Sequence, residues 1–210
     1  MKLRIVIWWL LLIIGALAAT VPPAESADRV PTVALKFQRD LTRNARAVWG
    51  LDAPTATFAA QIHQESAWRT DARSPYASGL AQFTPATADE ISSRYRDELG
   101  ANQPLNPSWA LRALVRYDLE LWSRVTAATP CDRAAFMLAS YNGGPGGLDR
   151  DRAYARKNGA DPNRWWGNVE LWSRKAPQFF TENRGYPKRI LLRWQSVYAS
   201  WGPGIDCSQV

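Results

Sequence analysis

The sequence has few of the side chains that bind zinc or iron. Its 210 residues include one histidine, His63, and two cysteines, Cys131 and Cys207. Sites for these metals usually take three or four histidine or cysteine ligands. We therefore expect neither metal ligands nor a cofactor.

Strand signals are also scarce, because no run of alternating β-branched residues stands out. Apolar residues recur instead at helical spacing over residues 34–48, and Gly50 stands where that helix would end. A second helix is predicted to begin at Thr55 or Thr57 and to end after Ser66.

Prolines mark further helix starts. Thr84-Pro85 and Asn106-Pro107 each resemble an N-cap followed by proline at the first helical position. The helix from Pro107 is predicted to be the longest. Asp132 is expected to cap the next helix, over residues 134–140, and Pro187 is expected to open the last one.

Two stretches, residues 67–83 and 141–180, are dense in glycine, proline, asparagine and aspartate, and we expect them to be irregular. The first has room for a small hairpin. With 46% hydrophobic and 21% charged residues, the composition is that of a globular protein. The predicted fold is a single, mostly α-helical domain with at most a small β-hairpin.

The N-terminal apolar run is shorter than the roughly twenty residues that span a bilayer. Two positive charges precede it, it extends from Ile5 to Gly15, and small residues in an A-x-A pattern follow. Residues 1–19 are therefore predicted to be a signal peptide, with a retained N-terminal membrane anchor as the alternative. Residues 20–31 would be a short linker and residues 32–210 the folded domain, exported to the periplasm or cell envelope.

Export changes how the cysteines are interpreted. In an oxidising compartment, Cys131 and Cys207 are expected to form a disulfide, although two buried free thiols are the alternative.

The chain carries a formal charge of +7 and eleven tryptophans. Arginine and tryptophan stack on flat partners, so nucleic acid and polysaccharide are both candidate ligands. No nucleic-acid motif is present, and an export signal argues against such a partner. The sequence thus favours polysaccharide.

Glu65 stands where the second predicted helix ends. The negative end of the helix dipole and an apolar neighbour such as Trp68 would both favour its protonated form. A raised pKa is what a general acid needs near neutral pH. Taken alone, however, a glutamate on a helix is more often a solvated surface charge.

Several sequence blocks resemble the soluble lytic transglycosylase family of the lysozyme superfamily. They are an E-S pair, an S-P pair, a G-L-x-Q loop, a P-x-T-A helix start, an A-Y-N-A-G-P-G-like block and an E-T-R-x-Y-like block. In chain order these are Glu65-Ser66, Ser74-Pro75, Gly79-Leu80-Ala81-Gln82, Pro85-Ala86-Thr87-Ala88, Ala139-Ser140-Tyr141-Asn142-Gly143-Gly144-Pro145-Gly146 and Glu182-Asn183-Arg184-Gly185-Tyr186.

The resemblance implies a lysozyme-like helical domain of the goose-type or lytic transglycosylase kind, acting on the glycan strands of peptidoglycan. The residue matching Glu65 would protonate the glycosidic oxygen between N-acetylmuramic acid and N-acetylglucosamine. It would then act as base on the muramoyl 6-hydroxyl, giving a 1,6-anhydro end. A monomer would suffice, and any membrane association would run through the N-terminus.

Supporting roles follow from the same resemblance. Ser74 and Gln82 would bind sugar substituents, and Tyr141 and Asn142 would position the sugar ring. Glu182, together with Tyr186, would close the site from the far side. The residues alone also allow structural roles for these side chains, as core aromatics, helix caps or first-turn charges.

The chain departs from the family pattern at Ala81, where methionine is common, at Ser140 and Gly143, where the pattern has alanine, and in the length of two segments. The loop from Ser74 to Gln82 is one residue shorter than usual, and the segment between Gly147 and Glu182 is longer. In that longer segment Trp165 and Trp166 could either stack on sugar rings or pack in the core.

Three alternatives to a lytic transglycosylase remain open at this point. A hydrolytic muramidase would use Glu65 in the same way but pass the cleaved sugar to water. A phage endolysin would share the scaffold. A basic wall-binding protein would need no acid at a helix end.

Overall fold

The computed structural model describes residues 29–210, which are mostly helical and contain no strand. The helices are α1 (Thr32–Leu35), α2 (Gln38–Trp49), α3 (Thr55–Ser66), α4 (Pro85–Arg94), α5 (Arg96–Leu99), α6 (Pro107–Ser123), α7 (Pro130–Gly143), α8 (Pro145–Lys157), η1 (Val169–Leu171), α9 (Pro177–Arg189), η2 (Ile190–Trp194), α10 (Gln195–Val197) and η3 (Ala199–Trp201). The predicted fold class is confirmed. The predicted signal or anchor (residues 1–19) lies outside the described residues.

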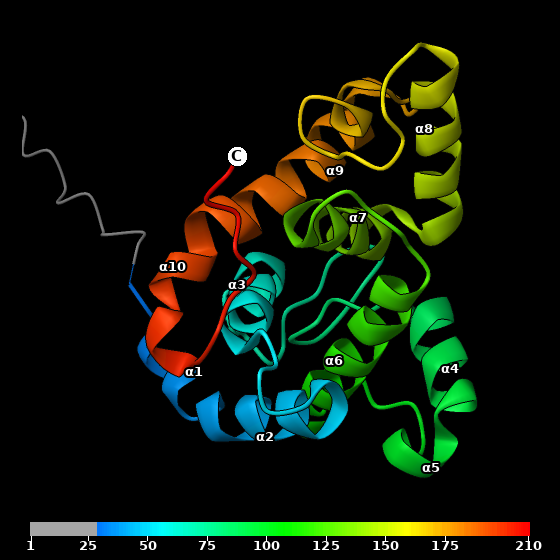
Figure 1. The fold of residues 1–210 in the computed structure, drawn as a ribbon. Coiled ribbons are helices and arrows are strands. Elements are labelled where there is room, and N and C mark those ends of the chain that lie inside the picture. The colour runs from blue at the N-terminus through cyan, green and yellow to red at the C-terminus, as the bar shows by residue number, and fades with distance from the viewer. Residues whose placement is uncertain (1–28) are drawn as a thin grey trace, which may run out of the picture.

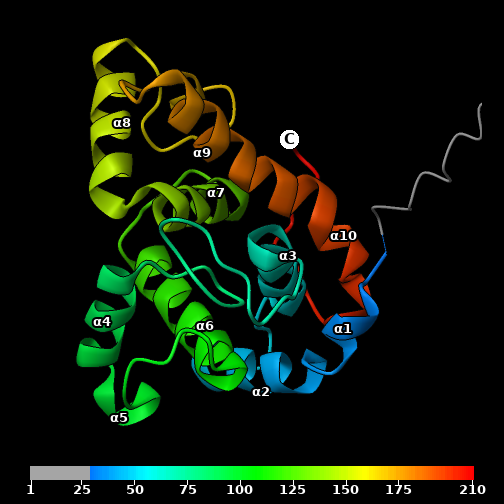
Figure 2. The ribbon, with the colours of Figure 1, turned by 180° about the vertical axis from the view of Figure 1, so that it is seen from behind.

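Helix α3 occupies the centre of the fold. Figures 1 and 2 show α9 and α10 along one side of α3, and α6 and α7 on the other. Every residue from Thr55 to Ile62 is buried, and three of these are alanines. A helix that is buried on all sides needs small or apolar side chains on every face. The short side chains of α3 also allow the neighbouring helices to approach closely.

The predicted caps of α4 and α6 are confirmed, but the predicted cap of α7 is wrong. The Thr84 hydroxyl accepts from the Thr87 N–H, and the Asn106 side chain accepts from two backbone N–H groups. In α7 the cap is Thr129, whose hydroxyl accepts from the N–H of Asp132. Pro130 at the first helical position moves the helix start ahead of Asp132.

The expected helix start at Pro187 is also wrong. Pro187 lies inside α9, which begins at Pro177. The chain stays helical through the proline and continues as η2, a π-helical segment. A proline inside a helix removes one backbone hydrogen bond, and α9 stays helical in spite of this loss because it packs against α7.

Two further expectations need correction. The segment 141–180 is not irregular throughout, because Gly144 adopts a φ of 77° and Pro145 then begins α8. The helix predicted over residues 34–48 is interrupted at Lys36 and Phe37, between α1 and α2. Phe37 itself is buried and continues the apolar face.

Residues 67–83 form a folded-back loop in place of a true hairpin. Two isolated antiparallel β-bridges hold the loop together. One pairs Arg73 with Ser78, and the other pairs Ser78 with Phe83. Gly79 has a φ of 80°, and a Cβ there would lie 1.9 Å from the carbonyl oxygen of Pro104. The loop can pack this closely only with glycine at that position.

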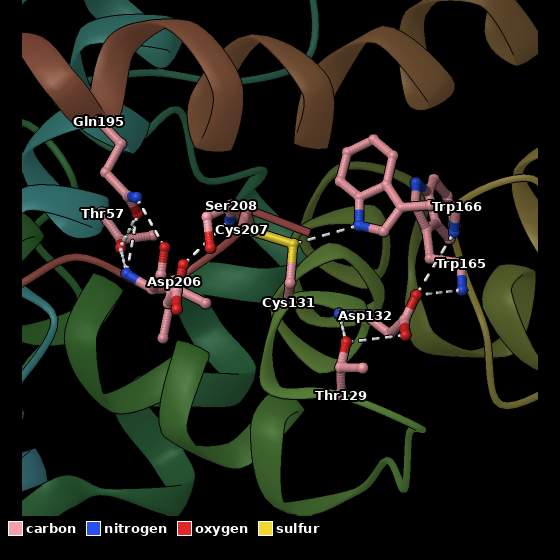
Figure 3. The surroundings of a disulfide bond; sticks show 11 residues. Thr57, Thr129, Cys131, Asp132, Trp165, Trp166, Gln195, Asp206, Cys207 and Ser208 are labelled. Atoms are coloured by element: carbon pink, nitrogen blue, oxygen red, sulfur yellow. Dashed lines mark hydrogen bonds between the residues drawn. A yellow bond between two sulfur atoms is a disulfide. The ribbon is translucent and has the colours of Figure 1, made fainter. Parts of the chain in front are cut away.

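The C-terminal tail returns to the centre of the fold, where the predicted disulfide joins Cys207 to Cys131 at the start of α7 (Figure 3). Upstream of it, the Pro203 carbonyl accepts from the N–H of Ala56 on α3. The tail therefore covers the first turn of α3.

Trp165 and Trp166 pack in this same region. Trp165 is fully buried, with its ring edge-on to Phe136. The indole N–H of Trp166 points at the Cys131 sulfur, 3.2 Å away (Figure 3). Of the two roles open from the sequence, core packing is the one observed.

Reduction of the disulfide should lower the free energy of unfolding by about 4 kcal/mol, because the bridge closes a long loop. The sequence separation of the two cysteines is 76 residues. Denaturant unfolding with and without reductant measures this loss. A Cys131→Ser/Cys207→Ser variant is the control, and its stability should not respond to reductant. Equal stability of oxidised and reduced wild type would contradict the prediction.

Candidate active site

A cleft of about 650 Å³ opens at the C-terminal end of α3. It lies between α3, the loop of residues 67–83, the end of α7 and α9. All seven site residues predicted from the sequence line it: Glu65, Ser74, Gln82, Tyr141, Asn142, Glu182 and Tyr186. Another hollow, of about 570 Å³, runs along the C-terminal tail and contains none of them.

Glu65 lies in the last turn of α3 and is half-buried at the cleft surface. Burial raises the pKa of Glu65 to about 8, a hydrogen bond from the Tyr186 hydroxyl opposes the rise, and the charge of Glu182 adds to it. The carboxyl is therefore mostly protonated at pH 7. This is the protonation state that a general acid requires.

Trp68, the expected apolar neighbour of Glu65, does not line the cleft. Its ring is fully buried and stacks on Phe37, and its N–H donates to the hydroxyl of Tyr198. Ala67 and Trp68 both have positive φ values, so the chain turns sharply away once α3 ends.

Two tyrosines lie beside Glu65. The rings of Tyr141 and Tyr186 are parallel, with centroids 6.5 Å apart. Burial, followed by the charge of Glu65, holds the pKa of both phenols well above the usual value. Both remain neutral hydrogen-bond donors. Tyr186 donates to Glu65, whereas Tyr141 donates to the carbonyl of Ala81 at 2.7 Å.

Ser74 and Gln82 hold the shape of the loop on the other side of the cleft. The Ser74 hydroxyl accepts from the N–H groups of Tyr76 and Ala77. The amide nitrogen of Gln82 donates to the carbonyls of Ala72 and Gly79, at 3.1 and 2.9 Å. The Gln82 amide nitrogen is thus already engaged, and its carbonyl oxygen is the atom it offers to a ligand.

Asn142 and Glu182 meet at the end of α7. The amide of Asn142 donates to the Glu182 carboxylate at 3.3 Å and accepts from Asn183 at 3.0 Å. Asn183 also donates to the carbonyl of Ala139. These bonds join α7 to α9 directly beneath the cleft.

An ion-pair network supports α9 from the side of α8. Buried Asp151 accepts from Lys175 and Arg184, with N–O distances of 2.5 and 2.9 Å. Arg184 also donates to three backbone carbonyls, at residues 169, 170 and 172. The segment that is longer than the family pattern therefore fixes α9, and Lys175 reaches the cleft from it.

Several residues of the cleft were not predicted from the sequence. These are Gln64, Tyr76, Lys175, Phe179, Asn183 and Arg189. Gln64 precedes Glu65 and accepts from Arg189 at 3.0 Å and from the Trp194 indole at 3.2 Å. Its place beside the motif glutamate was the one available signal. Lys175, Phe179 and Arg189 lie outside every motif.

His63 packs among aromatic side chains outside the cleft. Its ring stacks on Trp194, with centroids 4.1 Å apart, and its Nδ1 lies 2.7 Å from the Tyr198 hydroxyl. Burial, with the nearby charge of Arg193, lowers its pKa. His63 is absent from the cleft lining.

A buried central helix whose last turn presents a protonatable glutamate to a cleft is the arrangement expected from the resemblance to the lysozyme-like superfamily. Residues 43–163 match the family model described as the transglycosylase SLT domain, which is more than half of the chain. The chain belongs to this family. Five of the seven predicted site residues lie in the matched range, and Glu182 and Tyr186 lie beyond it.

Curated relatives are longer proteins. The chain is 36% identical over 138 residues to membrane-bound lytic murein transglycosylase F 2 of Alkalilimnicola ehrlichii, covering 65% of this chain and 28% of that protein. It is 35% identical over 135 residues to membrane-bound lytic murein transglycosylase F of Marinobacter nauticus, covering 62% and 25%. The chain thus spans about a quarter of the curated relatives it matches.

Solved structures confirm the fold. The 70 kDa soluble lytic transglycosylase of Escherichia coli superposes with a TM-score of 0.57 at 22% identity, over 84% of this chain and 27% of that one. An inactive Glu-to-Gln mutant of the lytic transglycosylase Slt from Pseudomonas aeruginosa gives 0.58 at 24% identity, over the same two shares.

Tyr186→Phe should raise the pKa of Glu65 above its value of about 8. The phenol bond favours the carboxylate, and the loss of one such bond corresponds to about one pH unit. NMR titration of ¹³C-labelled glutamate carboxyls, assigned with Glu65→Gln, measures this shift. Tyr154→Phe on α8 is the control and should leave the titration in place. A fall in the pKa of Glu65 in Tyr186→Phe would contradict the assigned bond.

Proposed function

We propose that this protein is a lytic transglycosylase that cleaves the β-1,4 bond between N-acetylmuramic acid and N-acetylglucosamine in peptidoglycan. The observation that carries this proposal is the position of Glu65, which lines one cleft together with the six other predicted site residues and whose pKa is raised by burial. Family membership and the names of the relatives support the substrate class.

In the first step, protonated Glu65 gives its proton to the glycosidic oxygen, and the bond from that oxygen to the muramoyl C1 breaks. Glu65 is then a carboxylate opposite a carbon with oxocarbenium character. The hydroxyl of Tyr186 donates to this carboxylate and stabilises it at the moment its charge appears.

In the second step, the Glu65 carboxylate takes the proton of the muramoyl 6-hydroxyl, whose oxygen bonds to C1. This closes the 1,6-anhydro ring and returns the proton to Glu65, so that one group serves as acid and then as base. A tethered hydroxyl competes well with water because its effective molarity, when aligned, is about 10⁵ M or more.

The remaining cleft residues bind and orient the glycan. Tyr141 and Asn142, at the end of α7, would hold the muramoyl ring, and Ser74 and Gln82 would contact sugar substituents from the loop. Each of these side chains lines the cleft and has at least one bond that fixes its direction.

A hydrolytic muramidase is the second candidate, and one observation favours it. Glu182 lies in the cleft, and its charge contributes to the raised pKa of Glu65. A second carboxylate opposite the acid is what a hydrolase uses to hold a water molecule. The two candidates differ in their product.

The location of the protein is part of the proposal. We infer that residues 1–19 direct export to the periplasm or cell envelope and that residues 32–210 form a monomeric catalytic domain behind a linker of residues 20–31. Within residues 29–210, none of the helices combines the length and apolar character needed to cross a bilayer. The two relatives named above are described as membrane-bound.

Glu65→Gln should abolish cleavage of purified peptidoglycan, because the amide keeps the shape of the side chain and lacks the transferable proton. The loss should be at least about 10²–10⁴-fold. Release of soluble fragments measures it, with circular dichroism to verify folding. Glu90→Gln, on the outer face of α4, is the control. Activity of Glu65→Gln within tenfold of wild type would remove Glu65 from the mechanism, and binding without cleavage by wild type would indicate a wall-binding protein.

Digestion in ¹⁸O-labelled water should leave the muramoyl ends unlabelled. Ring closure by the 6-hydroxyl takes no oxygen from water, so each product is one water lighter than a hydrolase product. Mass spectrometry of the released fragments distinguishes the two, with a commercial muramidase digest as the labelled standard. Muramoyl ends that carry ¹⁸O would identify the enzyme as a muramidase and give Glu182 the role of holding the water.

A further inference from the structure

Two polar side chains face each other in the core behind the cleft. Gln61 on α3 and Asp118 on α6 are both fully buried. The Gln61 amide nitrogen donates to Asp118 Oδ1 at 3.3 Å. The other oxygen of each group, Gln61 Oε1 and Asp118 Oδ2, is also buried and has no hydrogen-bond partner.

Both unpartnered atoms are acceptors when Asp118 is ionised. Two such oxygens in one buried pair would leave two desolvation costs and an uncompensated charge in the core. A single proton on Asp118 Oδ2 removes all of these costs, because the resulting O–H can donate to Gln61 Oε1. The acid and the amide then exchange two hydrogen bonds in a closed ring.

We propose that Gln61 and Asp118 form a neutral acid–amide pair and that Asp118 is a positioning residue for Glu65. Gln61 precedes Glu65 by four residues, so the two side chains lie on the same face of α3, one turn apart. The pair therefore joins α3 to α6 one turn before Glu65, and it places no charge there.

The titratable groups around the pair agree with this arrangement. Burial raises the pKa of Asp118 well above its usual value, the Gln61 bond opposes the rise, and the charge of Glu65 adds to it. The other groups coupled to Asp118 are the phenols of Tyr117 on α6, Tyr141 on α7 and Tyr186 on α9, all with raised pKa values. None of these phenols is a cation that could stabilise an ionised Asp118.

The pH dependence of unfolding tests the protonation of Asp118. In the unfolded chain an aspartate ionises above about pH 4, so a folded state that keeps the proton loses stability as pH rises. The unfolding equilibrium constant of wild type should therefore rise about tenfold per pH unit relative to Asp118→Asn between pH 5 and pH 7. A ratio that stays constant over this range would show that Asp118 is ionised and would overturn the proposal.

Exchanging the acid and the amide provides the matched control. The double variant Gln61→Glu/Asp118→Asn has the same side-chain lengths and again one acid facing one amide. It should show the wild-type dependence on pH, which Asp118→Asn lacks. Gln61→Glu alone places two acids together, and a pair that shares one proton carries one buried charge, so this variant should be less stable than wild type at pH 7. A double variant with the flat profile of Asp118→Asn would contradict the acid–amide pair.

The pH dependence of activity tests whether the pair influences Glu65. This experiment rests on the proposed function, whereas the unfolding experiments do not. Asp118→Asn replaces one neutral group by another, so the alkaline limb of the kcat/KM profile should keep its position. Gln61→Glu should move that limb to higher pH, because a buried charge one turn away raises the pKa of Glu65, and the double variant should restore it. A limb that moves to lower pH in Asp118→Asn, or stays fixed in Gln61→Glu, would show that the pair does not act through Glu65.

Discussion

The burial of α3 on all sides is the constraint on which the rest of the structure depends. Its first eight residues are enclosed by the neighbouring helices and by the C-terminal tail, so only its last turn reaches solvent. Glu65 occupies that turn and is pushed toward its neutral form by the same packing that stabilises the helix. A core built around one central helix thus produces both the fold and the raised pKa of the glutamate in the last turn of that helix.

The sequence predicted the elements whose signals are local. The Thr84-Pro85 and Asn106-Pro107 starts were correct because a cap and a proline act within a few residues of each other. The start of α7 was misplaced because both Thr129 and Asp132 are competent caps, and the choice depends on Pro130. The helix through Pro187 could not be predicted, since only packing of α9 against α7 compensates for the lost N–H.

In the candidate site, too, the residues that belong to a sequence motif were predicted, and those placed by contacts with distant residues were not. Motif resemblance placed seven residues that the structure brings to one cleft, although they span more than half of the chain. It gave no information on Lys175, which reaches the cleft because buried Asp151 and Arg184 fix the segment before α9. It also gave no information on the positive φ values after α3, which turn the chain so that the Trp68 ring is buried in the core. Such effects depend on contacts between residues far apart in sequence.

The returning tail has a consequence for when the domain can finish folding. Residues 203–207 cover the first turn of α3 and are bonded to Ala56, Thr57 and Cys131. These residues follow every helix of the described chain. A chain in which all of these helices have been made therefore still lacks the cover of its central one. The enclosure of α3, and with it the burial that raises the pKa of Glu65, depends on a segment that is synthesised after all of the helices.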